Sequence, residues 1–219
     1  GTTTINLPSG SPGGSTDIAK EQPNSAIVLT KNAEIKGKSG NQNTDRIVIK
    51  SNSVGVSQDT FGDGTTRVGI YTQAGATLYM ERVTLSMTDY SLSSYLGHST
   101  LIRAGGYTTI NHCKLDAQKC NLGLYMGSGA WANIAYTELS MKLGGANSSG
   151  LNFSSGTDSK LQYSSGTIEA TYPIYTYGKL TVYDAGGTLT LNGTDRAVMV
   201  QYDSKNQTGG ELLLDRANI

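Results

Sequence analysis

The chain has 219 residues, 28 of them Gly and 13 of them Tyr, and only 16% of its residues are charged, a composition that favours strands and turns over helices. Its 17 basic and 17 acidic residues balance and no basic run appears, which argues against a nucleic-acid partner. No apolar stretch approaches the roughly 18 to 20 residues of a membrane-spanning helix, so we expect a soluble mature piece from which any targeting segment has been removed.

The first segment, residues 1–24, is rich in Thr, Ser, Pro and Gly. We expect it to be an N-terminal cap or a flexible lead-in, because the open end of a stack of strands exposes unpaired backbone edges. Residues 25–66 then alternate apolar and polar side chains as strands do, although their register is not clear. Their apolar positions are Ile27, Leu29, Ile35, Ile47, Ile49, Val54 and Val56. We assign them to the first coils of a single domain that spans residues 25–219.

From residue 66 onward, three short apolar runs recur with a period of about 24 residues. The first anchors, separated by 32, 22, 27, 23 and 24 residues, are Ile70, Ile102, Leu124, Leu151, Ile174 and Val198. The second anchors are Leu78, Ile110, Ile134, Leu161 and Val182. The third anchors are Leu85, Leu115, Leu139, Ile168 and Leu189.

Within each run the apolar residues alternate with other residues, as in a strand with one buried face. Gly-rich and Ser-rich corners separate the runs, and so short a period leaves no room for crossover helices. The sequence therefore predicts an all-β fold. We expect a right-handed parallel β-helix, a solenoid with three short strands per coil and about 22–27 residues per coil. Leu212, Leu213 and Leu214 break off in mid-pattern, as expected of a solenoid truncated at its C-terminal end.

The residue that follows each first anchor has outward parity. Five such residues should form one exposed vertical column with steps of about 4.8 Å. They are Tyr71, Arg103, Tyr125, Asn152 and Tyr175. The residues before the anchors should keep the neighbouring column low, and they are Gly69, Gly123, Gly150, Pro173 and Ala197. Tyr and Arg suit contact with carbohydrate or protein, so this column is the predicted ligand-binding site. Stacked outward Tyr residues also stabilise parallel sheets by packing alone, and this alternative stays open.

The longest connection lies between Leu85 and Ile102. Long loops on a rigid scaffold often carry function, which makes Asp89, Tyr90 and Tyr95 further candidate contact residues. A tolerated insertion would give the same pattern.

Residues for catalysis are sparse. The only histidines are His98 and His112, and no G-x-S-x-G motif is present, so we do not expect a Ser–His–Asp hydrolase. The position after the third anchor offers Asp116 and Glu169, two coils and roughly 9 to 10 Å apart, at the edge of the range for an inverting glycosidase. We therefore expect no enzyme, no cofactor and no metal site, with a polysaccharide lyase or glycosidase as the alternative.

Cys113 and Cys120 enclose six residues, a spacing that fits neither a zinc site nor a CxxC redox motif. They form either a small local disulfide or two free thiols. We predict the disulfide, because the other features indicate a protein outside the cytosol.

Two units of the repeat illustrate its spacing of Gly and apolar residues. They are Gly69-Ile70-Tyr71 with Gly75-Ala76-Thr77-Leu78 and Val83-Thr84-Leu85, then Gly123-Leu124-Tyr125 with Gly129-Ala130-Trp131 and Thr137-Glu138-Leu139. In these units, over about residues 66–219, the chain resembles the passenger domains of bacterial autotransporters, especially the pertactin-like group.

The resemblance implies export across the outer membrane of a Gram-negative bacterium and display at the cell surface or secretion. It also implies a non-catalytic role in cell adhesion, self-association, biofilm formation or virulence. The expected partners are a host-surface glycan, an extracellular-matrix protein or another copy of the chain, with no nucleic acid. Membrane attachment is expected only through a translocator barrel that this chain does not contain. The predicted function is therefore an adhesin, with a polysaccharide-active enzyme and a structural spacer as alternatives.

Overall fold

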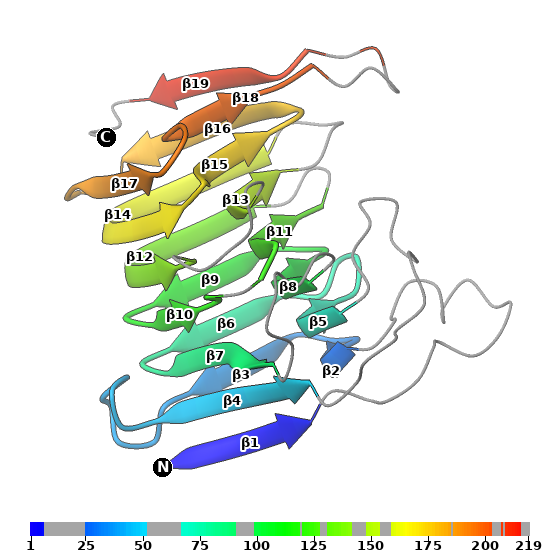
Figure 1. Ribbon diagram of the computed structural model, residues 1–219, viewed down its shortest axis with the longest axis vertical. Helices are drawn as coiled ribbons and strands as arrows, with labels where there is room; N and C mark the ends of the chain where they lie inside the picture. The colour runs from blue at the N-terminus through cyan, green and yellow to red at the C-terminus, as the bar shows by residue number, and fades with distance from the viewer. Residues whose placement is uncertain are drawn as a thin grey trace, which may run out of the picture.

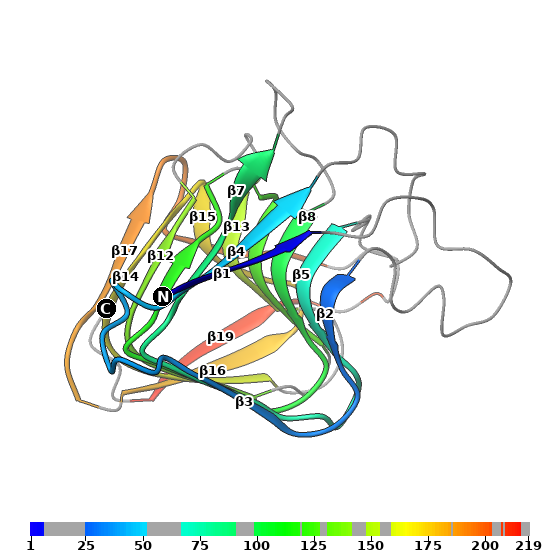
Figure 2. The same cartoon turned by 90° about the horizontal axis from the view of Figure 1, so that it is seen from below.

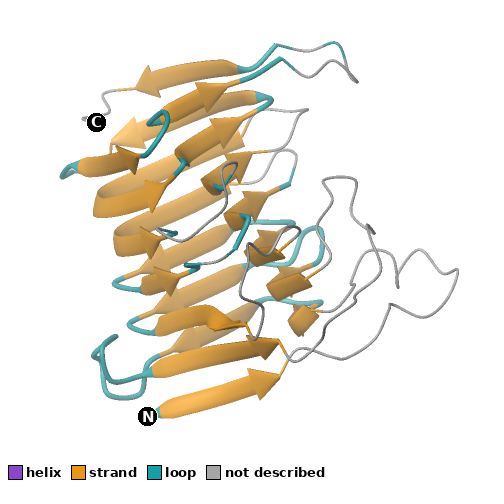
Figure 3. Cartoon of the chain, viewed as in Figure 1, coloured by secondary structure: helices purple, strands orange, loops and turns teal. Residues whose placement is uncertain are grey.

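The computed structural model describes residues 1–6, 25–51, 67–90, 99–118, 120–127, 131–141, 148–153, 159–184, 186–202, 207 and 209–215. Within these ranges every regular element is a strand (Figure 3). The described residues accordingly contain no helix long and apolar enough to cross a membrane.

The strands form two curled parallel sheets that wind around one core. The 7-stranded sheet contains, in stacking order, β2 (Ser25–Leu29), β5 (Arg67–Thr72), β8 (Ser99–Ala104), β11 (Leu122–Met126), β13 (Ser149–Phe153), β15 (Tyr172–Thr176) and β18 (Val198–Val200). Viewed from below, the strands of successive coils superpose around a three-sided outline (Figure 2).

The 12-stranded sheet supplies the other two sides. Its first side stacks β3 (Ala33–Lys36), β6 (Leu78–Glu81), β9 (Thr108–Asn111), the starts of β12 (Trp131–Ser140) and β14 (Ser159–Ala170), β16 (Lys179–Asp184) and β19 (Glu211–Asp215). Its second side stacks β1 (Thr2–Asn6), β4 (Arg46–Ser51), β7 (Thr84–Tyr90), β10 (Lys114–Asp116), the ends of β12 and β14, and β17 (Leu189–Gly193). β1 lies at one end of the stack and β19 at the other (Figure 1). The all-β, solenoid-like arrangement expected from the sequence is therefore present.

The predicted first anchors are confirmed as one inward line. The backbone register aligns Ile27, Ile70, Ile102, Leu124, Leu151, Ile174 and Val198. The third line is also confirmed, except that it ends on Leu191 instead of Leu189: its members are Ile47, Leu85, Leu115, Leu139, Ile168 and Leu191.

The predicted second line is wrong in register by two residues. Leu78, Leu161 and Val182 lie in one inward line with Thr108 and Ala132. The neighbouring inward line contains Met80, Ile110, Ile134 and Tyr163. A slip of two residues leaves the same strand face inward, so the apolar alternation alone could not exclude it.

The bend between the two sides of the 12-stranded sheet uses a left-handed backbone conformation. It recurs at equivalent corner positions with φ of 53°, 49°, 48° and 33° at Arg82, His112, Tyr136 and Ser165. The amide N–H groups of Arg82 and His112 donate to the carbonyls of Asn111 and Ala135 in the next coil, 3.0 and 2.9 Å away. The turn therefore continues the pairing between coils through the bend.

The glycines before the first anchors point into the core, which corrects the prediction of an outward low column. A Cβ at Gly123 would lie 2.6 Å from the carbonyl oxygen of Gly150 and 2.9 Å from a Leu139 methyl. In the same line, Leu101 is fully buried in the main core. Two consecutive residues of these strands thus face inward, and glycine leaves room for the third-anchor side chains opposite.

Replacing Gly123 with Ala should destabilise the fold by about 1 to 3 kcal/mol, because the added methyl overpacks the core. Chemical denaturation measures the change in free energy of unfolding. Gly127→Ala is the matched control, since its Cβ would meet its nearest atom at an ordinary 3.4 Å. Equal stability of the two variants would contradict the inward placement of Gly123.

Asp45 closes the corner that precedes β4. The Gly1 amino group lies 2.8 Å from its Oδ1, and the Ser39 amide donates to its Oδ2 over 2.5 Å. The hydrogen bond from the amino group, followed by that from Ser39, lowers the pKa of Asp45 from 3.8 to about 2. Because the pKa is lowered in the folded state, the carboxylate contributes stability above pH 4, and this contribution is lost as the pH falls towards 2.

Asp45→Asn should therefore lower the melting temperature at pH 6 by more than at pH 2. Melting curves of the parent and the variant across this range measure the difference. A difference in melting temperature between parent and variant that stays constant from pH 6 to pH 2 would contradict the role assigned to the carboxylate.

Candidate functional site

The predicted ligand-binding column lies on the outer face of the 7-stranded sheet. Backbone pairing places its members side by side on successive coils, in the order Tyr71, Arg103, Tyr125, Asn152 and Tyr175. The neighbours at its two ends are Val28 and Met199. The membership of the column is thus confirmed, and we call these five residues the outer ladder.

The expected uniform exposure of the outer ladder is wrong. Tyr71 is 8% exposed and Asn152 is 7% exposed. Tyr71 packs with Val68 in a small apolar pair separate from the main core. Arg103, Tyr125 and Tyr175 are half-buried. A ligand could therefore reach only these three ladder residues to any useful extent.

Arg103 and Tyr125 contact one another. The guanidinium carbon of Arg103 lies 4.2 Å from the centroid of the Tyr125 ring, which is cation–π geometry. This contact covers part of one ring face and holds the guanidinium against the sheet. The pair is therefore preorganised, and the exposed part of these two half-buried side chains is what a partner could contact.

Three tyrosines gather at the C-terminal end of the ladder, and we call Tyr172, Tyr175 and Tyr177 the tyrosine cluster. The ring centroid of Tyr175 lies 5.6 Å from that of Tyr172 and 5.0 Å from that of Tyr177. The Tyr175 hydroxyl donates to Gln201 Oε1 and lies 3.3 Å from the Tyr177 hydroxyl. Burial, and then the bond to Tyr177, raises the pKa of Tyr175. A hydrogen bond to Asp195, followed by burial, raises the pKa of Tyr172.

Sequence reasoning missed Tyr172 and Tyr177. The available signal was their closeness to Tyr175 in the sequence, since Tyr172 lies three residues before it and Tyr177 two residues after it. Strict alternation assigns Tyr172 to the face opposite Tyr175. The inward pair Pro173 and Ile174 breaks the alternation, so Tyr172 instead meets Tyr175 outside the core.

The connection after Leu85 is shorter than predicted. Asp89 and Tyr90 end strand β7, where they pair in register with Lys50 and Ser51. They therefore belong to the sheet and not to a loop. Tyr95 lies outside the described residues.

The predicted disulfide is absent, since Cys113 and Cys120 are both free and buried. Cys113 precedes the extended strand β10, and its Sγ donates to the carbonyl of Asn111 over 3.3 Å. Cys120 follows the same strand and approaches the carbonyl of Met87. Strand β10 and a turn, closed by the hydrogen bond from the Cys120 amide to the Ala117 carbonyl, lie between the two thiols.

Both thiols should consequently stay reduced in purified protein. Denatured without reductant, the chain should react with a disulfide-exchange reagent at two thiols, whereas the native protein should react slowly because burial shields both thiols and raises the pKa of Cys113. A denatured chain with no reactive thiol would mean that the bridge forms.

A polar line crosses the outer face of the 12-stranded sheet. The register confirms that Ser86, Asp116, Ser140 and Glu169 lie side by side. The Ser86 hydroxyl donates to Asp116 Oδ2 and the Ser140 hydroxyl to Glu169 Oε2, each over 3.4 Å. The serines thus alternate with the carboxylates, so Asp116 and Glu169 stay two coils apart as expected.

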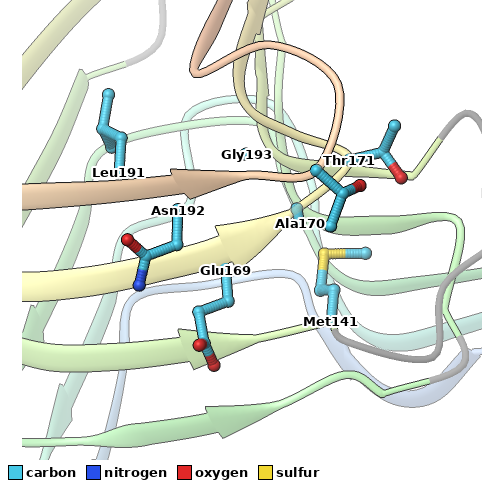
Figure 4. A pocket seen from close by; sticks show the side chains of 8 residues that line it. Met141, Glu169, Ala170, Thr171, Leu191, Asn192 and Gly193 are labelled. Carbon is cyan, nitrogen blue, oxygen red and sulfur yellow. The ribbon is translucent and has the colours of Figure 1, made fainter.

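A hollow of about 420 Å³ lies beside Glu169 (Figure 4). Its lining residues are Met141, Glu169, Ala170, Thr171, Leu191, Asn192, Gly193 and Thr194. Glu169 is the one ionisable group in this set. Among the described residues that line the hollow, no second carboxylate accompanies Glu169 for acid–base hydrolysis of a glycoside.

A second hollow, of about 300 Å³, is lined by more charged side chains than the first. It is lined in part by Arg46, Lys114, Asp116 and Glu138. Lys114 Nζ lies 3.6 Å from Glu138 Oε2, and Asp116 Oδ1 is buried without a hydrogen-bond partner. Among the residues that the structure describes, no three His, Cys, Asp or Glu side chains are grouped closely enough to hold a metal ion.

Comparisons with known proteins add no identification, because no family model, curated protein or solved structure matches the chain.

Proposed function

We propose that the chain is a right-handed parallel β-helix that acts as a non-catalytic adhesin at a bacterial cell surface or in secreted form. The main support is the outer ladder with its tyrosine cluster, in which Arg103, Tyr125 and Tyr175 remain partly accessible. Arg103 and Tyr125 lie on adjoining coils, and Tyr175 lies two coils beyond Tyr125. The right hand is inferred from the strong preference for right-handed crossovers between parallel strands.

Rigid aromatic side chains suit this role. Each Tyr offers a broad apolar ring and a polar hydroxyl while losing little side-chain entropy on binding. Hydrogen bonds and ring contacts already fix Tyr175 between Tyr172 and Tyr177. Binding a partner therefore costs these three side chains little further conformational entropy. The surface is a shallow, amphipathic strip that suits a glycan chain or a protein segment.

The location and the partner class rest on the resemblance to autotransporter passengers. On this proposal the rod is exported across the outer membrane of a Gram-negative bacterium. Its partner is then a host-surface glycan, an extracellular-matrix protein or a second copy of the chain.

A polysaccharide-active enzyme is the second candidate, and the smaller hollow favours it. Asp116 and Glu138 lie on paired strands two residues out of step, a backbone separation on the order of 8 Å, which falls within the range for inverting glycosidases. The unpartnered Asp116 Oδ1 is the group that could act as base. Release of new reducing ends or unsaturated products from a glycan panel, abolished by Asp116→Asn, would favour this candidate over the adhesin.

Changing Arg103, Tyr125 and Tyr175 together to Ala should weaken adhesion at least tenfold. Each aromatic contact is worth about 1 kcal/mol, and about 1.4 kcal/mol corresponds to tenfold in affinity. Binding to immobilised matrix proteins and a glycan array measures the loss, with circular dichroism and melting temperature confirming the fold.

The control changes Arg82 and Tyr136 to Ala, which removes one Arg and one Tyr from the bend of the 12-stranded sheet. It should bind like the parent. A folded triple variant that adheres as well as this control would mean that the outer ladder only packs against itself, and a spacer would then fit better than an adhesin.

A further inference from the structure

A second aromatic surface lies on another side of the coil, where β9, β12 and β14 pair. Trp131 is the single tryptophan of the chain and is 40% exposed, and Tyr107 is 38% exposed. The pairing of Ala132 with Thr108 places the two rings on neighbouring coils. Their centroids lie 5.3 Å apart at an interplanar angle of 82°. Two large aromatic rings thus remain exposed to solvent, although the next residue along the chain from each of them is buried.

A cation stands beside this pair. Lys160 pairs with Trp131 in the next coil, and its Nζ lies 5.5 Å from the centroid of the indole ring. Lys160 is exposed, and it forms no ion pair with any residue that the structure describes. Its exposed ammonium group is therefore held near the aromatic surface.

Neutral hydrogen-bonding groups line the same face two residues further along each strand. Thr109, Asn133 and Gln162 lie side by side there and are half-buried. They offer a hydroxyl and two amides, which together can donate and accept. The surface formed by Tyr107, Trp131, Lys160, Thr109, Asn133 and Gln162, here called the tryptophan platform, therefore carries one positive charge and no negative charge.

We propose that the tryptophan platform binds an acidic glycan, one that contains uronic or sialic acid. A sugar ring has an apolar C–H face that can lie on Trp131 or Tyr107, and hydroxyl edges that can bond Asn133 and Gln162. A carboxylate on the same chain would pair with Lys160 in a charge-assisted hydrogen bond. The single positive charge on an otherwise neutral platform selects an acidic over a neutral glycan.

This inference goes beyond the proposed adhesin, because the platform lies on the 12-stranded sheet, around β9, β12 and β14, whereas the outer ladder lies on β5, β8, β11, β13 and β15 of the 7-stranded sheet. The two surfaces share no residue. Variants of one should therefore leave binding at the other unchanged.

The fluorescence of Trp131 provides a direct measurement of binding to the platform. Titration with oligogalacturonate or sialyllactose should change the tryptophan emission in a saturable way, while a neutral oligosaccharide of equal length should bind at least tenfold more weakly. Lys160→Gln should raise the Kd for the acidic sugar on the order of tenfold, and Lys160→Arg should keep it near the parent value. Lys38→Gln, which removes an exposed lysine elsewhere, is the matched control and should have no effect.

Calorimetry with Trp131→Ala gives a readout that does not depend on fluorescence, and binding should fall at least tenfold. No saturable response to any acidic sugar would overturn the proposal, as would equal binding of neutral sugars with no effect of Lys160→Gln. The outer-ladder triple variant should retain acidic-sugar binding. If that variant loses adhesion but keeps acidic-sugar binding, the two sites act independently. Failure of the tryptophan platform is then seen as loss of acidic-sugar binding alone, and failure of the outer ladder as loss of adhesion alone.

Discussion

Parallel backbone pairing between successive coils is the constraint on which the rest of this structure depends. It sets a step of about 4.8 Å and forces equivalent residues of every coil into vertical lines. The inward line through Ile70, Ile102 and Leu124 exists because each strand must pair with the next in one register. Connections between coils can differ in length without disturbing these lines, because only the strands are held by the pairing.

The sequence was sufficient for features that depend on apolar alternation. The first and third lines could be predicted because a single aliphatic residue stands at nearly every coil. The second line could not be placed, since Leu78 and Met80 are both inward and two residues apart. The glycine column was misassigned because alternation cannot predict consecutive inward residues. The adjacent apolar pairs Leu101–Ile102 and Pro173–Ile174 were the signs of this in the sequence.

The sequence was sufficient to predict which residues form the outer ladder, but not how exposed each of them is. Register alone brings Tyr71 and Tyr125 into one column, yet Tyr71 is buried and packs with Val68. Such outside contacts depend on side chains in a neighbouring column, which no periodicity encodes. The disulfide prediction was wrong for a related reason. Six intervening residues suggested proximity, but strand β10 and the turn after it lie between Cys113 and Cys120, and both thiols are free.

The same pairing that fixes the core also decides what the outer faces can do. Each outward side chain lies between the side chains at the same position of the coils above and below it. The chemistry of a functional group on this surface therefore depends on these two neighbours. In the polar line this places Ser86 and Ser140 against the carboxylates of Asp116 and Glu169, and each serine occupies one carboxylate oxygen. In the outer ladder and the tryptophan platform it places rings and cations in contact along the rod. Extended strips of this kind favour binding of linear partners, because one strand of glycan or peptide can meet the same column on several coils.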